Sequence, residues 1–124
     1  MERALLVGTG GFIGSIARYW FGGVVQRWTG TSFPAGTLAV NIVGSFILGV
    51  VLALSFDRDL VSPNVRLLLG VGFCGGFTTM STFSYETVAL LREGSLVAGI
   101  GNIGASIIAC LCAVWLGDAA ARLL

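Results

Sequence analysis

The chain has 124 residues, of which 56% are hydrophobic and only 10% are charged, and its mean hydropathy is +0.94. A soluble domain usually carries about 25% charged residues, so this composition indicates an integral membrane protein. The net charge of +1 is too small to suggest a nucleic-acid partner. The chain contains no histidine, which removes imidazole catalysis from consideration, and we expect no enzyme.

Four apolar segments are each long enough to cross a hydrocarbon core of about 30 Å, which takes about 20 helical residues. In chain order they cover Ala4–Val25, Pro34–Phe56, Val65–Leu91 and Ser95–Leu116. We therefore predict an all-α membrane protein in which residues 1–124 form one domain of four transmembrane helices. Arg18 and the lack of an A-x-A site argue against a cleaved signal peptide at the N-terminus.

The third segment contains the stretch GFCGGFTTMSTFSYE, from Gly72 to Glu86. Glycine in a helix interior costs about 1 kcal/mol relative to alanine, so glycines beside a run of hydroxyl residues predict a helix that is broken near its midpoint. Unpaired backbone is tolerated in hydrocarbon only where it faces protein, water or an ion. A broken span is therefore a candidate binding or conduction site. Carbonyls from Gly75 to Thr78 would favour a cation, whereas the helix start near Thr79 would favour an anion.

Basic residues on the two sides of the predicted membrane domain are nearly balanced. One side would hold Arg3, Arg58, Arg66 and Arg122, and the other Arg18, Arg27 and Arg92. The positive-inside rule therefore does not fix an orientation. Our interpretation is that the chain inserts both ways and pairs as an antiparallel homodimer, whose second copy covers the broken span; a monomer with one orientation is the alternative.

Polar side chains recur every four residues on two of the predicted helices. They are Thr37, Asn41 and Ser45 on the second, and Asn102, Ser106 and Cys110 on the fourth. Residues at this spacing share a helix face, so each row either lines a pathway or binds neighbouring helices together. We favour the pathway because a hydroxyl-rich broken span accompanies both rows.

Two further features of the third segment have more than one interpretation. Glu86 is the only carboxylate well inside a predicted span, and it either serves function or anchors a helix end. Thr82, one turn earlier, could donate a hydrogen bond to it. Met80 and Phe83 either pack as apolar side chains or face an anion, because an aromatic ring edge is electropositive. The cysteines, Cys74, Cys110 and Cys112, fit apolar filling better than disulfides.

Three blocks of the sequence together resemble the small bacterial fluoride channels, a family with an older label tied to camphor resistance. The blocks are GGFIGSIARY at residues 10–19, GTLAVNIVGSF at residues 36–46 and GFCGGFTTMSTFS at residues 72–84. The resemblance covers essentially the whole chain. It implies a dual-topology, antiparallel homodimer in the bacterial inner membrane, with two pores that export fluoride passively.

The resemblance also assigns roles to particular residues. It implies that Thr37, Asn41 and Phe83 lie along the fluoride pathway and that backbone carbonyls of Gly75 and Thr78 hold a structural sodium ion at the dimer centre. Less secure matches to the polar part of the pathway are Ser81, Thr82, Asn102 and Ser106. The sequence departs from the family at Met80, where a phenylalanine is expected, and we predict that fluoride passage is retained but altered.

Two other functions remain open on the residues alone. A small multidrug transporter also has four spans and dual topology, but it would need a carboxylate in its first span, and the segment Ala4–Val25 has none. A structural membrane subunit would show no transport of its own. Fluoride efflux from liposomes separates the channel from both alternatives.

Overall fold

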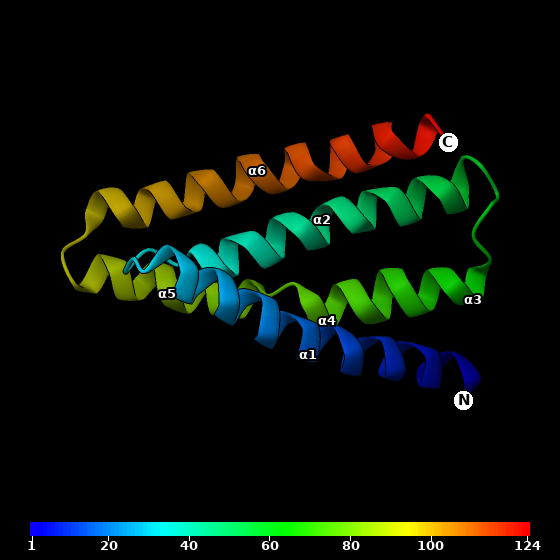
Figure 1. The fold of residues 1–124 in the computed structure, drawn as a ribbon, viewed down its shortest axis with the longest axis horizontal. Coiled ribbons are helices and arrows are strands. Elements are labelled where there is room, and N and C mark those ends of the chain that lie inside the picture. The colour runs from blue at the N-terminus through cyan, green and yellow to red at the C-terminus, as the bar shows by residue number, and fades with distance from the viewer.

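The computed structural model describes all 124 residues and contains only helices and their connections. Three helices are continuous: α1 (Glu2–Thr29), α2 (Ala35–Phe56) and α6 (Leu96–Arg122). The third rod of the bundle is composite and consists of α3 (Pro63–Arg66), the π-helix η1 (Leu67–Cys74), α4 (Gly75–Phe77) and α5 (Met80–Arg92). Figure 1 shows the elongated bundle with both termini and the α2–α3 connection at the same end. This placement agrees with the prediction that the N-terminus, the connection after the second span and the C-terminus lie on one side of the bundle.

Three helical segments are long and apolar enough to cross a membrane: Ala35–Phe56, Pro63–Arg92 and Leu96–Arg122. The first two segments agree with the second and third predicted spans to within a few residues. The third segment begins next to the fourth predicted span but extends further, to Arg122. The 28-residue helix α1 is not among them, and it carries Arg18 near its middle. That α1 also crosses the membrane therefore stays a prediction.

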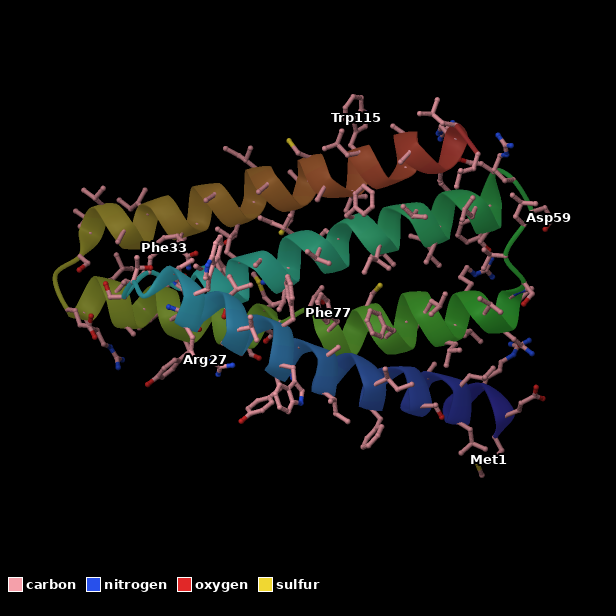
Figure 2. The ribbon with its side chains drawn as sticks, viewed as in Figure 1. Met1, Arg27, Phe33, Asp59, Phe77 and Trp115 are labelled. Atoms are coloured by element: carbon pink, nitrogen blue, oxygen red, sulfur yellow. The ribbon has the colours of Figure 1, made fainter.

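Short connections at the two ends of the bundle are tied by side chains. Gln26 closes the α1–α2 loop, because its Nε2 donates to the Phe33 carbonyl at 3.0 Å and its Oε1 accepts from the Gly36 amide at 3.0 Å. At the opposite end, Arg122 contacts Asp57 at 2.9 Å. Figure 2 shows Asp59 at this second end and Arg27 and Phe33 toward the first.

Glycines let α1 approach the third rod closely. A Cβ on Gly10 would collide with the Leu68 carbonyl, and one on Gly14 would collide with the Phe73 carbonyl. A Cβ on Gly72 would lie 2.8 Å from the Val7 carbonyl oxygen, which is also too close. Gly10 and Gly14, which lie four residues apart on one face of α1, thus pack closely against the third rod within the chain.

The glycine cluster does not itself break the third rod, which corrects one step of the sequence argument. Gly72 lies within the π-helix η1 and Gly75 and Gly76 lie in α4, so all three are helical, and the π-helical stretch was not predicted. Gly72 and Gly76 lie against α1, so their lack of a side chain serves helix contact. The break occurs after Phe77, in the run of hydroxyl residues.

Replacing Gly14 with alanine is expected to destabilise the protein by about 1–3 kcal/mol, the usual cost of forcing an extra methyl group into a packed core. The matched control is Gly8→Ala, because a Cβ at Gly8 has no neighbour within 4 Å. Thermal unfolding in detergent measures both variants. Equal melting temperatures for the two variants would show that the α1 contact is not tight.

Candidate functional site

The broken rod is the centre of the site. Helix α4 ends at Phe77, and Thr78 (φ −85°, ψ 159°) and Thr79 (φ −152°, ψ 112°) are extended. Thr79 then caps α5, since its Oγ1 accepts a hydrogen bond from the Thr82 amide at 3.2 Å. A hydroxyl at this position satisfies one of the amides that every helix start leaves unpaired. The predicted break near the midpoint of the third span is confirmed.

Asn41 on α2 holds the break in place through two hydrogen bonds. Its Oδ1 accepts from the Thr79 amide at 2.8 Å, and its Nδ2 donates to the Thr79 carbonyl at 3.2 Å. One side-chain amide thus replaces both backbone partners that an unbroken helix would supply to Thr79. We call this pair of bonds the Asn41–Thr79 clasp.

The carbonyls of Gly75 and Thr78 are among those that the break leaves without their usual helical donors. In a continuous α-helix the Thr79 amide would bond to the Gly75 carbonyl and the Thr82 amide to the Thr78 carbonyl. Here the first amide donates to Asn41 and the second to the Thr79 hydroxyl. Gly75 is exposed and Thr78 is half-buried, so their oxygens are available to an outside partner.

Two cavities meet at the break. The charged cavity, of about 350 Å³, is lined by α1, α2, α5 and the α1–α2 loop, and includes Arg18, Thr37, Thr79, Thr82 and Glu86. The break cavity, of about 620 Å³, lies between α2, α6 and the third rod, and includes Asn41, Gly75, Thr78, Thr79, Met80, Phe83 and Ser106. Thr79 lines both cavities. The clasped break therefore forms the boundary between a polar chamber and a largely apolar one.

Arg18 and Glu86 each bring one unpaired polar atom to the charged cavity. Arg18 Nε and Glu86 Oε2 are buried and have no hydrogen-bond partner. The other carboxylate oxygen of Glu86 accepts from Thr37 Oγ1 at 2.9 Å, so the partner is Thr37 and not the expected Thr82. A buried donor and acceptor without partners are costly, and water or an ion in this cavity would satisfy them.

The aromatic residues of the third rod occupy different environments. Phe77 is buried and stacks on Phe73, with ring centroids 5.4 Å apart, and Figure 2 shows it in the middle of the bundle. Phe83 is 9% exposed, whereas Met80 is 73% exposed. Both side chains line the break cavity. Phe77 thus serves packing, while Phe83 and Met80 border the open space.

The structure brings most of the predicted site residues together in the two cavities. Ser81 and Asn102 line neither: Ser81 is exposed and its hydroxyl lies 3.3 Å from Thr79 Oγ1, whereas Asn102 is buried. Thr79 was not among the predicted site residues, although it lines both cavities. Its position at the start of the predicted second half-helix was the signal, because threonine there is a favoured cap.

Comparison with known proteins gives a consistent result. Residues 5–118 match the family model described as "CrcB-like protein, Camphor Resistance (CrcB)". The chain is 45% identical over 122 residues to the fluoride-specific ion channel FluC of Geotalea daltonii, covering 98% of each chain. It is 42% identical over 124 residues to the FluC protein of Citrifermentans bemidjiense, covering all of both chains. With that of Sorangium cellulosum it shares 44% identity over 122 residues, which is 98% of this chain and 96% of the relative.

Proposed function

Because this chain belongs to the CrcB-like protein family, whose curated relatives are ion channels and not enzymes, we propose that it is a channel through which fluoride leaves the cell passively. The observation that carries the proposal is the pair of cavities that meet at the Asn41–Thr79 clasp. A conduction path needs polar groups that bind an ion without holding it tightly. In this chain the charged cavity contains Arg18. The break cavity beyond it contains neutral hydroxyls, the Asn41 amide and the Phe83 ring.

The charged cavity suits the first encounter with an anion. Arg18 supplies positive charge in a partly enclosed space, which raises the local concentration of anions. Thr79 and Thr82 place the start of α5 at the same cavity, and helix starts favour negative charge. Glu86 opposes this attraction, and its bond to Thr37 keeps one of its oxygens occupied.

The break cavity suits a small anion that has left the charged chamber. Asn41 uses one amide hydrogen in the clasp and therefore retains the second for a ligand. Ser106 adds a hydroxyl and Phe83 a ring, whose edge carries positive charge without a full cation. The polar pathway of the proposal thus runs through Thr37, Asn41, Thr82 and Ser106, with Phe83 and Met80 beside it and Ser81 at its margin.

We expect the working form to be an antiparallel homodimer with two pores in the bacterial inner membrane, and α1 to be the fourth span. A single chain would expose the break cavity and the free carbonyls to lipid, which backbone in hydrocarbon does not tolerate. A second copy inserted in the opposite sense would cover them. Near-equal arginine counts on the two sides allow both insertions.

The free carbonyls of Gly75 and Thr78 fit a structural sodium ion. Hard cations take oxygen ligands, and carbonyls at the end of a half-helix carry negative partial charge. Two carbonyls are too few to surround such an ion, so two copies of the chain would contribute together. When bound, the ion would neutralise carbonyl dipoles that no amide satisfies.

Cysteine cross-linking tests where the two copies meet. In a chain whose three native cysteines are replaced by alanine, we expect Gly75→Cys to form a disulfide-linked dimer in membranes, because Gly75 would lie at the dimer centre. Gly8→Cys, on the outer side of α1 with no neighbour within 4 Å, is the matched control. A monomer at Gly75→Cys, or equal cross-linking at both positions, would contradict the proposed interface.

Replacing Met80 with phenylalanine tests the contribution of a second ring. We expect fluoride efflux from liposomes to rise about two- to tenfold, because an aromatic contact is worth about 0.5–1.5 kcal/mol beyond its area. The unaltered chain, assayed at equal protein content, is the comparison. Equal rates would show that fluoride passage needs no ring at this position.

Purified protein in liposomes tests the proposed function itself. With valinomycin present so that potassium can follow, we expect rapid fluoride release, followed with a fluoride electrode, and little chloride release from matched liposomes. No fluoride release would favour a structural subunit without transport. Proton-coupled exchange of a cationic drug, without fluoride release, would favour the small multidrug transporter.

A further inference from the structure

Asn102 is among the most deeply buried polar residues of the chain, with only 2% of its surface exposed. It lies on α6, and its Nδ2 donates to Thr87 Oγ1 on α5 at 2.9 Å. Thr87 in turn donates to the carbonyl of Phe83 at 2.7 Å. The Asn102–Thr87 bond is the one side-chain hydrogen bond between α5 and α6, and it meets α5 one turn beyond Phe83.

The other end of the same amide reaches a second residue of the break cavity. Ser106 Oγ lies 3.5 Å from Asn102 Oδ1 and donates a weak hydrogen bond to it, longer than the roughly 2.5–3.0 Å of an ordinary O–H···O bond. Ser106 and Phe83 both line the break cavity, whereas Asn102 does not. Asn102 is therefore connected through Thr87 to the backbone carbonyl of Phe83 and directly to the Ser106 hydroxyl, although it does not line the cavity itself.

We propose that Asn102 is a positioning residue, which sets the Phe83 ring and the Ser106 hydroxyl relative to each other across the break cavity. The inference rests on the proposed function, because it gives Phe83 and Ser106 a task in fluoride passage. A buried amide needs partners for its donors and its acceptor. In this structure its two partners are Thr87, which bonds to Phe83, and Ser106. Phe83 and Ser106 line the same cavity, so Asn102 is attached to both.

The physical effect follows from how α5 is held. Without the Asn102 bond, the turn from Phe83 to Thr87 keeps its helical hydrogen bonds but loses its polar attachment to α6. The ring can then adopt more than one orientation relative to Ser106. An anion that binds a ring edge depends strongly on this orientation, whereas simple packing does not.

Fluoride efflux from liposomes tests the proposal with four variants. We expect Thr87→Val and Asn102→Leu each to lower the efflux rate per protein by roughly tenfold, the size expected from one lost buried hydrogen bond. The double variant should lose no more than Asn102→Leu alone, because that change already removes the bond to Thr87. Thr87→Ser keeps the hydroxyl and should retain the unaltered rate. Ser84→Ala is the matched control, since Ser84 makes the same bond to its own helix at Met80 but has no partner on α6.

A spectroscopic measurement separates positioning from conduction. With 4-fluorophenylalanine at position 83, we expect one narrow fluorine resonance in the otherwise unaltered chain and shifted or multiple resonances in Thr87→Val and Asn102→Leu. Unchanged resonances in both variants would overturn the proposal, and so would unchanged efflux accompanied only by a lower melting temperature. If the unaltered chain passes no fluoride, the proposed function fails, while the resonances still decide whether Asn102 orients the ring.

Discussion

Replacing Asn41 with alanine is expected to reduce fluoride efflux by about 100-fold or more. The change removes both bonds of the clasp and leaves the Thr79 amide and carbonyl unpaired within the bundle. Each unpaired buried group costs about 1–3 kcal/mol, and the two losses fall on the residue that separates the cavities. Efflux from liposomes at equal protein content, with a size-exclusion profile for each variant, measures the effect.

Two comparisons make the Asn41 result specific. Asn64→Ala removes an asparagine from an exposed site, where its amide lies 3.5 Å from Glu2, and should leave efflux unchanged. Asn41→Asp keeps an acceptor for the Thr79 amide but sets a carboxylate oxygen against the carbonyl and a negative charge beside the path, so we expect a loss at least as large as that of Asn41→Ala. Normal efflux from Asn41→Ala would show that the clasp is dispensable and that the path does not depend on this break.

The second large effect is expected at Arg18. Replacing it with glutamine should lower efflux about tenfold at low fluoride and less at high fluoride, because a charge in a cleft raises the on-rate of ions by about 10- to 1000-fold. Electrode traces over a range of fluoride concentrations measure this dependence. Rising ionic strength should reduce the difference between the two proteins, since salt screens the charge.

Arg27→Gln is the control for Arg18. Arg27 is on the same helix but is exposed and does not line the charged cavity. Its variant should therefore behave like the unaltered chain. If both arginine variants lose the same fraction of efflux, the effect comes from net charge and not from the cavity.

The general architecture could be predicted from sequence because membrane constraints act locally. Apolar length predicted the three spans from Pro34 onward, and Pro34 and Gly94 lie in short connections next to helix ends. The break was predictable in kind but its cause was misassigned. Glycine cost suggested Gly72–Gly76, whereas those glycines remain helical because the α1 backbone lies against Gly72 and Gly76. A glycine can either interrupt a helix or allow another helix to approach closely. Which of these occurs depends on the neighbouring helix, which the sequence of one segment does not specify.

The polar contacts could likewise be predicted only in part. Four-residue spacing predicted which faces of α2 and α6 are polar, yet it did not predict which atoms pair. Asn41 is 38 positions from Thr79, and Thr37 is 49 positions from Glu86. Contacts over such separations depend on how the helices pack, which is why Thr82 was the expected partner of Glu86 and Thr37 is the observed one.

The most direct measurement of the central claim, that fluoride crosses as a free ion past the clasped break, is potassium fluoride efflux from liposomes with and without valinomycin. A passive channel moves net charge, so the account predicts fast fluoride release when valinomycin lets potassium follow, and almost none without it. Release at the same rate in both conditions would mean electroneutral exchange and would contradict the account, as would no release in either.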